Sequence, residues 1–141
     1  MKIELIRGGL HTDERGTVSF VNDFDFKWVG RFYTIRSHRC GDPRGWIGHQ
    51  MEQKGFAALS GSVLVAAVKI DDWESPSLSL SVQRYTLSSA TPAVLRIPPG
   101  HACAMVMLTD DALLGVFSSG KIEDTAKDDW RFDVGMWQVS G

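Results

Sequence analysis

The stretch Ser62-Val-Leu-Val-Ala-Ala-Val-Lys-Ile70 is apolar along almost its whole length. Successive side chains of an extended strand point to opposite faces, so an uninterrupted apolar run hides both faces from water. Such a strand is covered on both sides, as it is in a β-sandwich or jelly roll. The stretch therefore predicts a layered β fold with residues 62–70 in its middle.

The rest of the chain has the same character. Gly and Pro interrupt it at short intervals, and the runs between them are short and rich in Val, Ile, Phe and Trp, which is typical of many short strands. We expect further strands near Lys2–Arg7, Gly16–Asn22, Val29–Arg36, Trp46–Gln53, Lys54–Leu59, Leu78–Leu87, Ala93–Ile97, Ala102–Thr109 and Ala112–Ser118.

Two connecting segments carry local signals. Thr109-Asp-Asp-Ala112 is a candidate hairpin turn. The polar segment Gly120–Asp129 suits one helical turn, with Glu123 and Asp124 near its start. With no linker or repeat, the sequence predicts one all-β domain over residues 1–141, a sandwich or jelly roll.

Composition excludes several classes of partner. The 141 residues carry a formal net charge of −2 and no strongly basic region, which argues against a nucleic-acid partner. No apolar run approaches the roughly 20 residues of a membrane span, and no secretory signal is visible. We therefore expect a cytoplasmic protein, in which Cys40 and Cys103 are reduced thiols, although a disulfide between them stays open.

Two blocks of sequence carry a family resemblance. The first is Arg44-Gly-Trp-Ile-Gly-His-Gln-Met-Glu-Gln-Lys-Gly-Phe56, followed by Leu59-Ser-Gly-Ser-Val63, and the second is Leu95-Arg-Ile-Pro-Pro-Gly-His-Ala102. In this order they resemble the dTDP-4-dehydrorhamnose 3,5-epimerase and dTDP-sugar 3,4-ketoisomerase families of cupins. The resemblance implies a double-stranded β-helix (the cupin jelly roll), a nucleotide-sugar substrate, no metal or cofactor, and a homodimer.

Three positions depart from the pattern of these families. The ketoisomerases carry two histidines in the first block, and the first of the two positions holds Ile47 here. The epimerases use a histidine where this chain has Cys103, and a late tyrosine where it has Phe117. His49 is the histidine of the first block that remains.

The expected reaction defines the catalytic candidates. A carbon next to the carbonyl of a 4-keto sugar is acidic, so isomerisation or epimerisation needs a base and a partner for the enediolate oxygen. A neutral histidine suits the base near pH 7, which makes His49 the first candidate. Tyr33 and His101 are candidates for the acid or oxyanion partner.

Five further residues are candidates for binding the substrate. Arg44, and after it Arg31, has the paired donors that hold a diphosphate. Trp46 could stack on a base or sugar, while Glu52 and Gln53 could bond the ligand or orient His49. In a regular strand Arg44 and His49 point to opposite faces; a β-bulge near Gly45 or Gly48 would bring them together, and without one Arg44 would act from a neighbouring face or subunit.

Other interpretations stay open from sequence alone. Trp46 and Tyr33 could be core residues, and His101 a turn residue. The missing histidine and tyrosine also fit a non-catalytic cupin that binds a nucleotide sugar. The pair His49 and Glu52 is the only support for a metal-dependent cupin enzyme.

Overall fold

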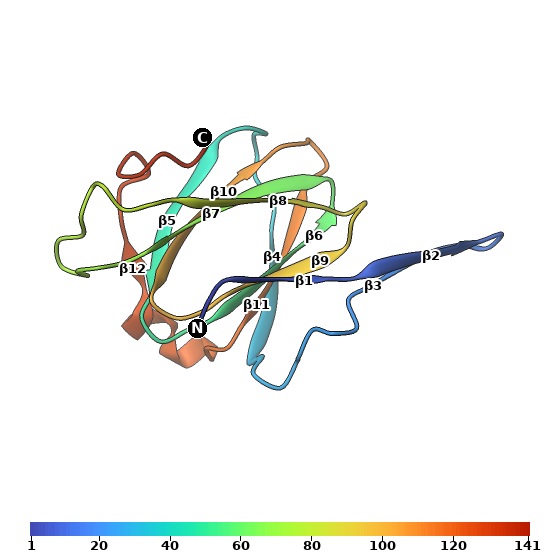
Figure 1. Cartoon of the computed structure of the whole chain (residues 1–141), viewed down its shortest axis with the longest axis horizontal. Helices are drawn as coiled ribbons and strands as arrows, with labels where there is room; N and C mark the ends of the chain where they lie inside the picture. Colours follow the sequence, from blue (N-terminus) through green and yellow to red (C-terminus); the bar gives the residue numbers. More distant parts are fainter.

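Two antiparallel five-stranded sheets stack face to face in the computed structural model, which describes residues 1–141 (Figure 1). The first sheet has the order β1 (Glu4–Arg7), β9 (Ala93–Ile97), β6 (Lys54–Ser60), β11 (Leu113–Ser118) and β4 (Arg31–Ile35). The second has the order β12 (Trp130–Arg131), β5 (Pro43–His49), β10 (His101–Met107), β7 (Ser62–Lys69) and β8 (Gln83–Ser88). This arrangement confirms the predicted jelly roll.

Strand β7 has the double-sided burial that its sequence predicts. Val63, Val65 and Ala67 pack into the core between the sheets, in a cluster of 12 buried residues. Ala66 and Val68 point the other way, into a second cluster of 9 buried residues on the outer face of the same sheet. The C-terminal residues Trp137 and Val139 cover that outer face, so β7 is buried on both sides.

Several predicted elements differ from the structure at their ends. The Thr109–Ala112 segment is not a hairpin, because β10 and β11 belong to different sheets and the segment crosses between them. The strand expected at Leu78–Leu87 begins only at Gln83; the loop before it is held by Asp71 and Asp72, whose side chains accept backbone N–H bonds. The helical turn expected in Gly120–Asp129 is confirmed as a 3₁₀ helix, η1 (Ile122–Asp128).

A hairpin near the N-terminus forms an arm. Strands β2 (Gly9–Asp13) and β3 (Gly16–Phe20) pair only with each other and project away from the two sheets (Figure 1). Leu10, Val18 and Phe20 on this arm are exposed. The sequence did not predict β2, because its side chains are polar or exposed and show no buried face.

Strand β5 contains the predicted bulge. Opposite β10, Cys103 pairs with Ile47 while Met105 pairs with Arg44, so three steps along β5 match two steps along β10. The extra residue lies at Gly45–Trp46, where a glycine favours such an irregularity. The bulge is therefore confirmed at the first of the two predicted glycines.

The sandwich has two open edges, one between β4 and the pair β5–β12, the other between β1 and β8. A cavity lies at the first edge and a depression at the second. None of the helical segments has the length and hydropathy required to cross a bilayer.

Candidate active-site cavity

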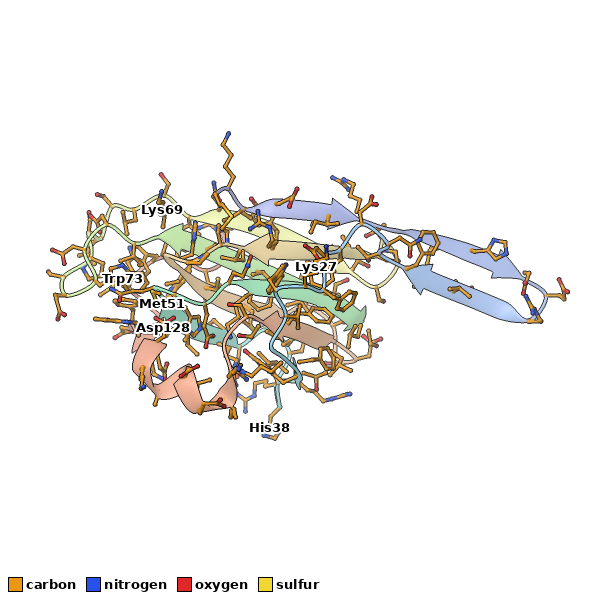
Figure 2. All side chains as sticks on the ribbon, turned by 90° about the horizontal axis from the view of Figure 1, so that it is seen from below. Lys27, His38, Met51, Lys69, Trp73 and Asp128 are labelled. Atoms are coloured by element: carbon orange, nitrogen blue, oxygen red, sulfur yellow. The ribbon has the colours of Figure 1, made fainter.

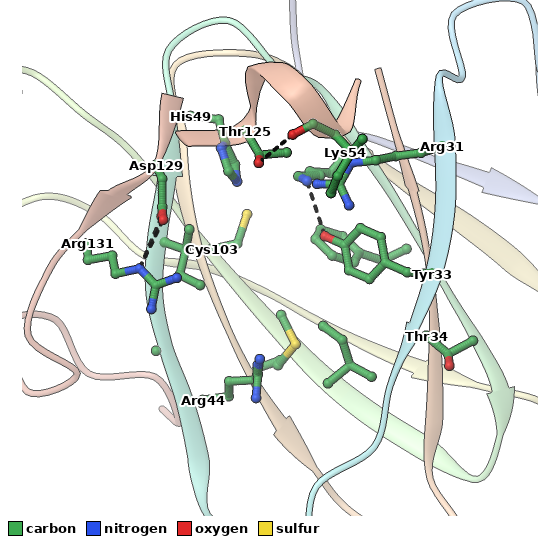
Figure 3. Close-up of a pocket in the computed structure, with 16 residues that line it drawn as sticks. Arg31, Tyr33, Thr34, Arg44, His49, Lys54, Cys103, Thr125, Asp129 and Arg131 are labelled. Carbon is green, nitrogen blue, oxygen red and sulfur yellow. Dashed lines mark hydrogen bonds and ion pairs between the residues drawn. The ribbon is translucent and has the colours of Figure 1, made fainter. Parts of the chain in front are cut away.

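A cavity of about 360 Å³ opens between β4 and β5 (Figure 3). Arg31 and Tyr33 enter it from β4, and Arg44 and His49 enter it from β5. The rest of the lining comes from the same two strands and from β6, β10, η1 and the segment that follows η1. Four of the eight residues predicted for the site thus meet in one cavity, because the bulge at Gly45 turns Arg44 to the same side as His49.

His49 is held in one tautomer by Asp128. The Nδ1–H of His49 donates to the backbone carbonyl of Asp128 at 2.6 Å, which leaves the Nε2 lone pair of a neutral ring available as a base. Burial lowers the pKa of His49, and the positive charge of Lys54 lowers it further. The ring is therefore neutral at pH 7, as a general base must be.

Asp128 also fixes the loop that follows His49. Its carboxylate accepts the backbone N–H groups of Gln50, Met51 and Glu52 at 2.6, 2.8 and 2.9 Å. Asp128 is buried at the end of η1, in the chain segment that closes one end of the cavity. The carboxylate and the carbonyl of one residue thus tie η1 to the end of β5.

A buried lysine forms the second polar group of the site. Lys54 on β6 is 5% exposed, and its Nζ lies 3.0 Å from Oε2 of the buried Glu52. The same ammonium donates to the hydroxyls of Tyr33 and Ser118, both at 3.2 Å. A lysine charge in such a site can stabilise a developing oxyanion, directly or through the tyrosine hydroxyl.

Glu52 lies behind Lys54 and Tyr33 and is not part of the cavity wall. Its Oε2 accepts the Ser118 hydroxyl at 3.1 Å and lies 3.7 Å from Nδ1 of His49. Of the two predicted roles for Glu52, orienting the site is the one that its position supports. The sequence missed Lys54, although it lies within the first block, because a lysine at the start of a strand is usually a surface residue.

Three arginines line the cavity. The guanidinium of Arg31 lies 4.6 Å from the ring centroid of Tyr33, and its buried Nε has no hydrogen-bond partner. Arg44 forms no ion pair, whereas Arg131 on β12 is paired with Asp129 at 3.1 Å. Arg31 and Arg44 thus offer unpaired positive charge to an anionic ligand. Arg131 and Asp129 were not predicted, since nothing in their local sequence marks them.

Three predicted residues lie outside the cavity. Trp46 is 1% exposed and its indole N–H donates to the Trp137 carbonyl at 3.1 Å, on the outer face of the sheet, so the prediction that it stacks on a ligand is wrong. The Gln53 side chain accepts an N–H of Arg96 at 3.4 Å, away from the cavity. His101 is the register partner of His49, but its ring lines the depression at the other edge.

The residues present do not fit a metal. No group of three or more His, Cys, Asp or Glu side chains is placed to hold an ion. Glu52 is engaged by Lys54, and burial raises the pKa of the Cys103 thiol to about 12, which disfavours the thiolate that a metal would need.

Comparison with known proteins gives the fold. No family model and no curated protein sequence matches the chain. Among solved structures, a sugar 3,4-ketoisomerase from Thermoanaerobacterium thermosaccharolyticum in complex with TDP is similar at 23% identity over 87% of this chain and 84% of that chain, with a TM-score of 0.66. A TDP-quinovose 3,4-ketoisomerase from Campylobacter jejuni is similar at 19% identity over 92% of each chain, with a TM-score of 0.69.

A third similar structure is an epimerase rather than a ketoisomerase. A dTDP-4-dehydrorhamnose 3,5-epimerase from Sulfolobus tokodaii is similar at 21% identity over 95% of this chain and 78% of that chain, with a TM-score of 0.76. These neighbours carry the two activities of the families that the sequence blocks resemble. Identities this low show a shared fold, and the cavity must supply the case for function.

Proposed function

We propose that the chain is a sugar-nucleotide isomerase or epimerase that acts on a dTDP-4-keto-6-deoxyhexose by proton transfer, without a metal. The observation that carries the proposal is the meeting of a neutral His49, the Lys54–Tyr33 pair and two unpaired arginines in one cavity. This set provides a base, an oxyanion partner and a diphosphate site, which are the three needs of the reaction.

In the proposed reaction, Nε2 of His49 removes a proton from the carbon next to the sugar carbonyl. The electron pair moves into the carbonyl, and the enediolate oxygen receives hydrogen bonds from the Tyr33 hydroxyl or the Lys54 ammonium. In ketoisomerisation, a proton is added to the former carbonyl carbon, and the hydroxyl proton of the adjacent carbon passes to the enediolate oxygen, which leaves the new carbonyl. In epimerisation, a second group such as Tyr33 delivers a proton to the opposite face of the carbon that His49 deprotonated. Because Ile47 replaces the other histidine of the first block, His49 is the base in both cases.

The reaction can be tested by isotope exchange. Incubation with dTDP-4-keto-6-deoxyglucose in D₂O should place deuterium at one ring carbon next to the carbonyl, as seen by NMR and mass spectrometry. Saturable binding of dTDP without any exchange would instead show a non-catalytic nucleotide-sugar-binding cupin. Absence of both binding and exchange would remove nucleotide sugars as the ligand.

Arg44 is the proposed anchor for the diphosphate. Arg44→Gln should raise KM about tenfold to a hundredfold with little change in kcat, because a hydrogen bond to a charged group is worth about 1.5–3 kcal/mol. Arg39→Gln is the control, since Arg39 is exposed and lies 3.8 Å from Asp42 outside the cavity. A fall in kcat with an unchanged KM would place Arg44 at the reacting carbon instead.

The pH dependence should report His49. Burial, and after it the positive charge of Lys54, lowers the pKa of His49 below the ordinary histidine value of about 6.5, so the base is unprotonated throughout the neutral range. We expect kcat/KM to be flat from about pH 7 upward with respect to this group and to fall as the pH drops through the lowered pKa. A midpoint above 6.5 for this limb of the profile would contradict the assignment.

We also propose a homodimer. The arm exposes Leu10, Val18 and Phe20, and Phe26 and Phe32 are exposed on the outer side of the first sheet. A monomer would leave this apolar surface in water. Light scattering should give about twice the 15.6 kDa chain mass, and Phe32→Ser should shift the protein toward monomer. A monomer mass at all accessible concentrations would refute the dimer.

Cys40 and Cys103 are free thiols, Cys40 exposed and Cys103 partly buried beside the cavity. Unpaired cysteines and a nucleotide-sugar substrate both suit a reducing compartment. We therefore place the proposed activity in the cytoplasm. Fractionation of cells that express the tagged chain tests this placement.

A further inference from the structure

A depression of about 600 Å³ lies at the second open edge of the sandwich, between β8 and the residues that lead into β1. Its polar lining includes Lys2, Lys69, Tyr85 and His101, and none of its lining residues is acidic. Figure 2 shows Lys69 toward the side of the molecule that carries β1, while Asp128 at the active-site cavity lies toward the other side. The depression is thus separate from that cavity.

The positive charge of this depression is not neutralised. Neither Lys2 nor Lys69 has a carboxylate within ion-pair distance, whereas Arg96, near the same edge, is paired with Glu4 at 3.3 Å. A concave surface with cations and no acidic group concentrates positive potential. A ligand that fits it carries negative charge.

His101 is the most constrained group in the depression. It is 9% exposed, and its Nδ1–H donates to the Pro98 carbonyl at 3.0 Å. Gly100, with φ of +92°, completes the turn, and its N–H donates to the His49 carbonyl at 2.8 Å. This anchoring leaves Nε2 of His101 without a protein partner.

Lys69 is the register partner of His101 on the neighbouring strand, so the two side chains project to the same face of the sheet. Burial lowers the pKa of His101, and the charge of Lys69 adds to this, so the His101 ring is neutral near pH 7 in the empty depression. An anion bound beside both groups would favour the protonated form of His101.

We propose that this depression is a second ligand site, which binds a small molecule through a phosphate group held by Lys69, His101 and Tyr85. A phosphate has several acceptor oxygens, and it can receive bonds from the Lys69 ammonium and the Tyr85 hydroxyl at once. Nε2 of His101 can accept a bond from a P–OH group while the ring is neutral, and donates one to a phosphate oxygen once the ring is protonated. Ile3 and Leu80 supply an apolar flank for an organic body. The site does not depend on the isomerase activity proposed for the other cavity.

The four histidines of the chain allow a direct test. Side-chain NMR signals of His101 should shift saturably during titration with inorganic phosphate, while those of the exposed His11 and His38 stay in place. Phosphate that bound only at the arginines of the active-site cavity would move His49 and leave His101 unchanged, which would overturn the proposal. A parallel titration with glucose 1-phosphate separates the two sources of phosphate: tighter binding than inorganic phosphate indicates an organic ligand.

Variants complete the test. Lys69→Gln should weaken the binding monitored at His101 about tenfold, the effect of losing one charged contact. Lys27→Gln, at an exposed lysine away from the depression, should leave the affinity unchanged. Because Lys69 is exposed and makes no hydrogen bond or ion pair through its side chain, its removal leaves the fold intact. Equal affinity in Lys69→Gln and the unaltered protein would refute the site, whether or not the isomerase activity exists.

Discussion

His49→Gln is expected to lower the rate of deuterium exchange into dTDP-4-keto-6-deoxyglucose about a hundredfold to ten-thousandfold, the usual range for loss of a general base. Glutamine fills much of the same space and can still donate to the Asp128 carbonyl, but it has no group that accepts a proton near pH 7. Substrate binding should change little, because the arginines that hold the diphosphate remain. Exchange measured by NMR, together with a Kd for dTDP, gives both quantities.

A matched variant separates this loss from a general effect of removing a histidine. His38→Gln changes an exposed residue outside the cavity and should keep full activity. If His49→Gln exchanged as fast as the unaltered protein, the base would have to be another group, and His49 would be only a structural residue. A loss of dTDP binding equal to the loss of exchange would point to misfolding of the cavity.

Asp128→Ala should have the largest effect on stability. The change removes the acceptor for three backbone N–H groups at once, including that of the buried Glu52. Hydrogen bonds to a charged acceptor are worth about 1.5–3 kcal/mol each, and three that share one carboxylate are not fully additive, so the free energy of unfolding should fall by about 3–5 kcal/mol. Urea unfolding measures this change.

The neighbouring acids provide the controls for Asp128. Asp124→Ala removes an exposed carboxylate from the same 3₁₀ helix and should alter the free energy of unfolding by less than about 0.5 kcal/mol. Asp128→Asn keeps one acceptor oxygen and should lose less than Asp128→Ala. If Asp128→Ala unfolded at the same urea concentration as the unaltered protein, the link between η1 and β5 would contribute nothing to stability.

The sequence predicted the core strands well and the edges poorly, for a physical reason. Residues 62–70 are apolar on both faces because the core covers one face of β7 and the C-terminal residues cover the other, so the strand can be recognised from its own sequence. Strand β2 has no buried face, so its sequence carries no alternation to detect. The crossing at Thr109–Ala112 resembles a hairpin locally, and only the pairing of β10 and β11 with other strands decides otherwise.

The site followed the same division. His49 and Arg44 were predicted from the first sequence block, whereas Arg31 and Tyr33 were candidates for their chemistry alone. A glycine signalled the bulge that brings Arg44 to the side of His49. Lys54 was missed because its burial depends on Glu52 and Ser118, which reach it through the fold. Trp46 was misplaced because it directly precedes Ile47, which faces the cavity, so strand alternation puts its indole on the outer face.

The bulge in β5 makes the ligand chemistry depend on a local irregularity of the backbone. In a strand without this bulge, regular alternation from Ile47 would place Gly45 opposite Met105 and turn Arg44 to the outer face of the sheet. Arg44 would then leave the cavity, while Ile47 and His49 kept their places and the sheet kept its pairing. Arg44 can therefore reach the cavity only because the backbone of β5 is irregular beside it, so the residue type alone does not decide whether a jelly roll presents this charge to a ligand.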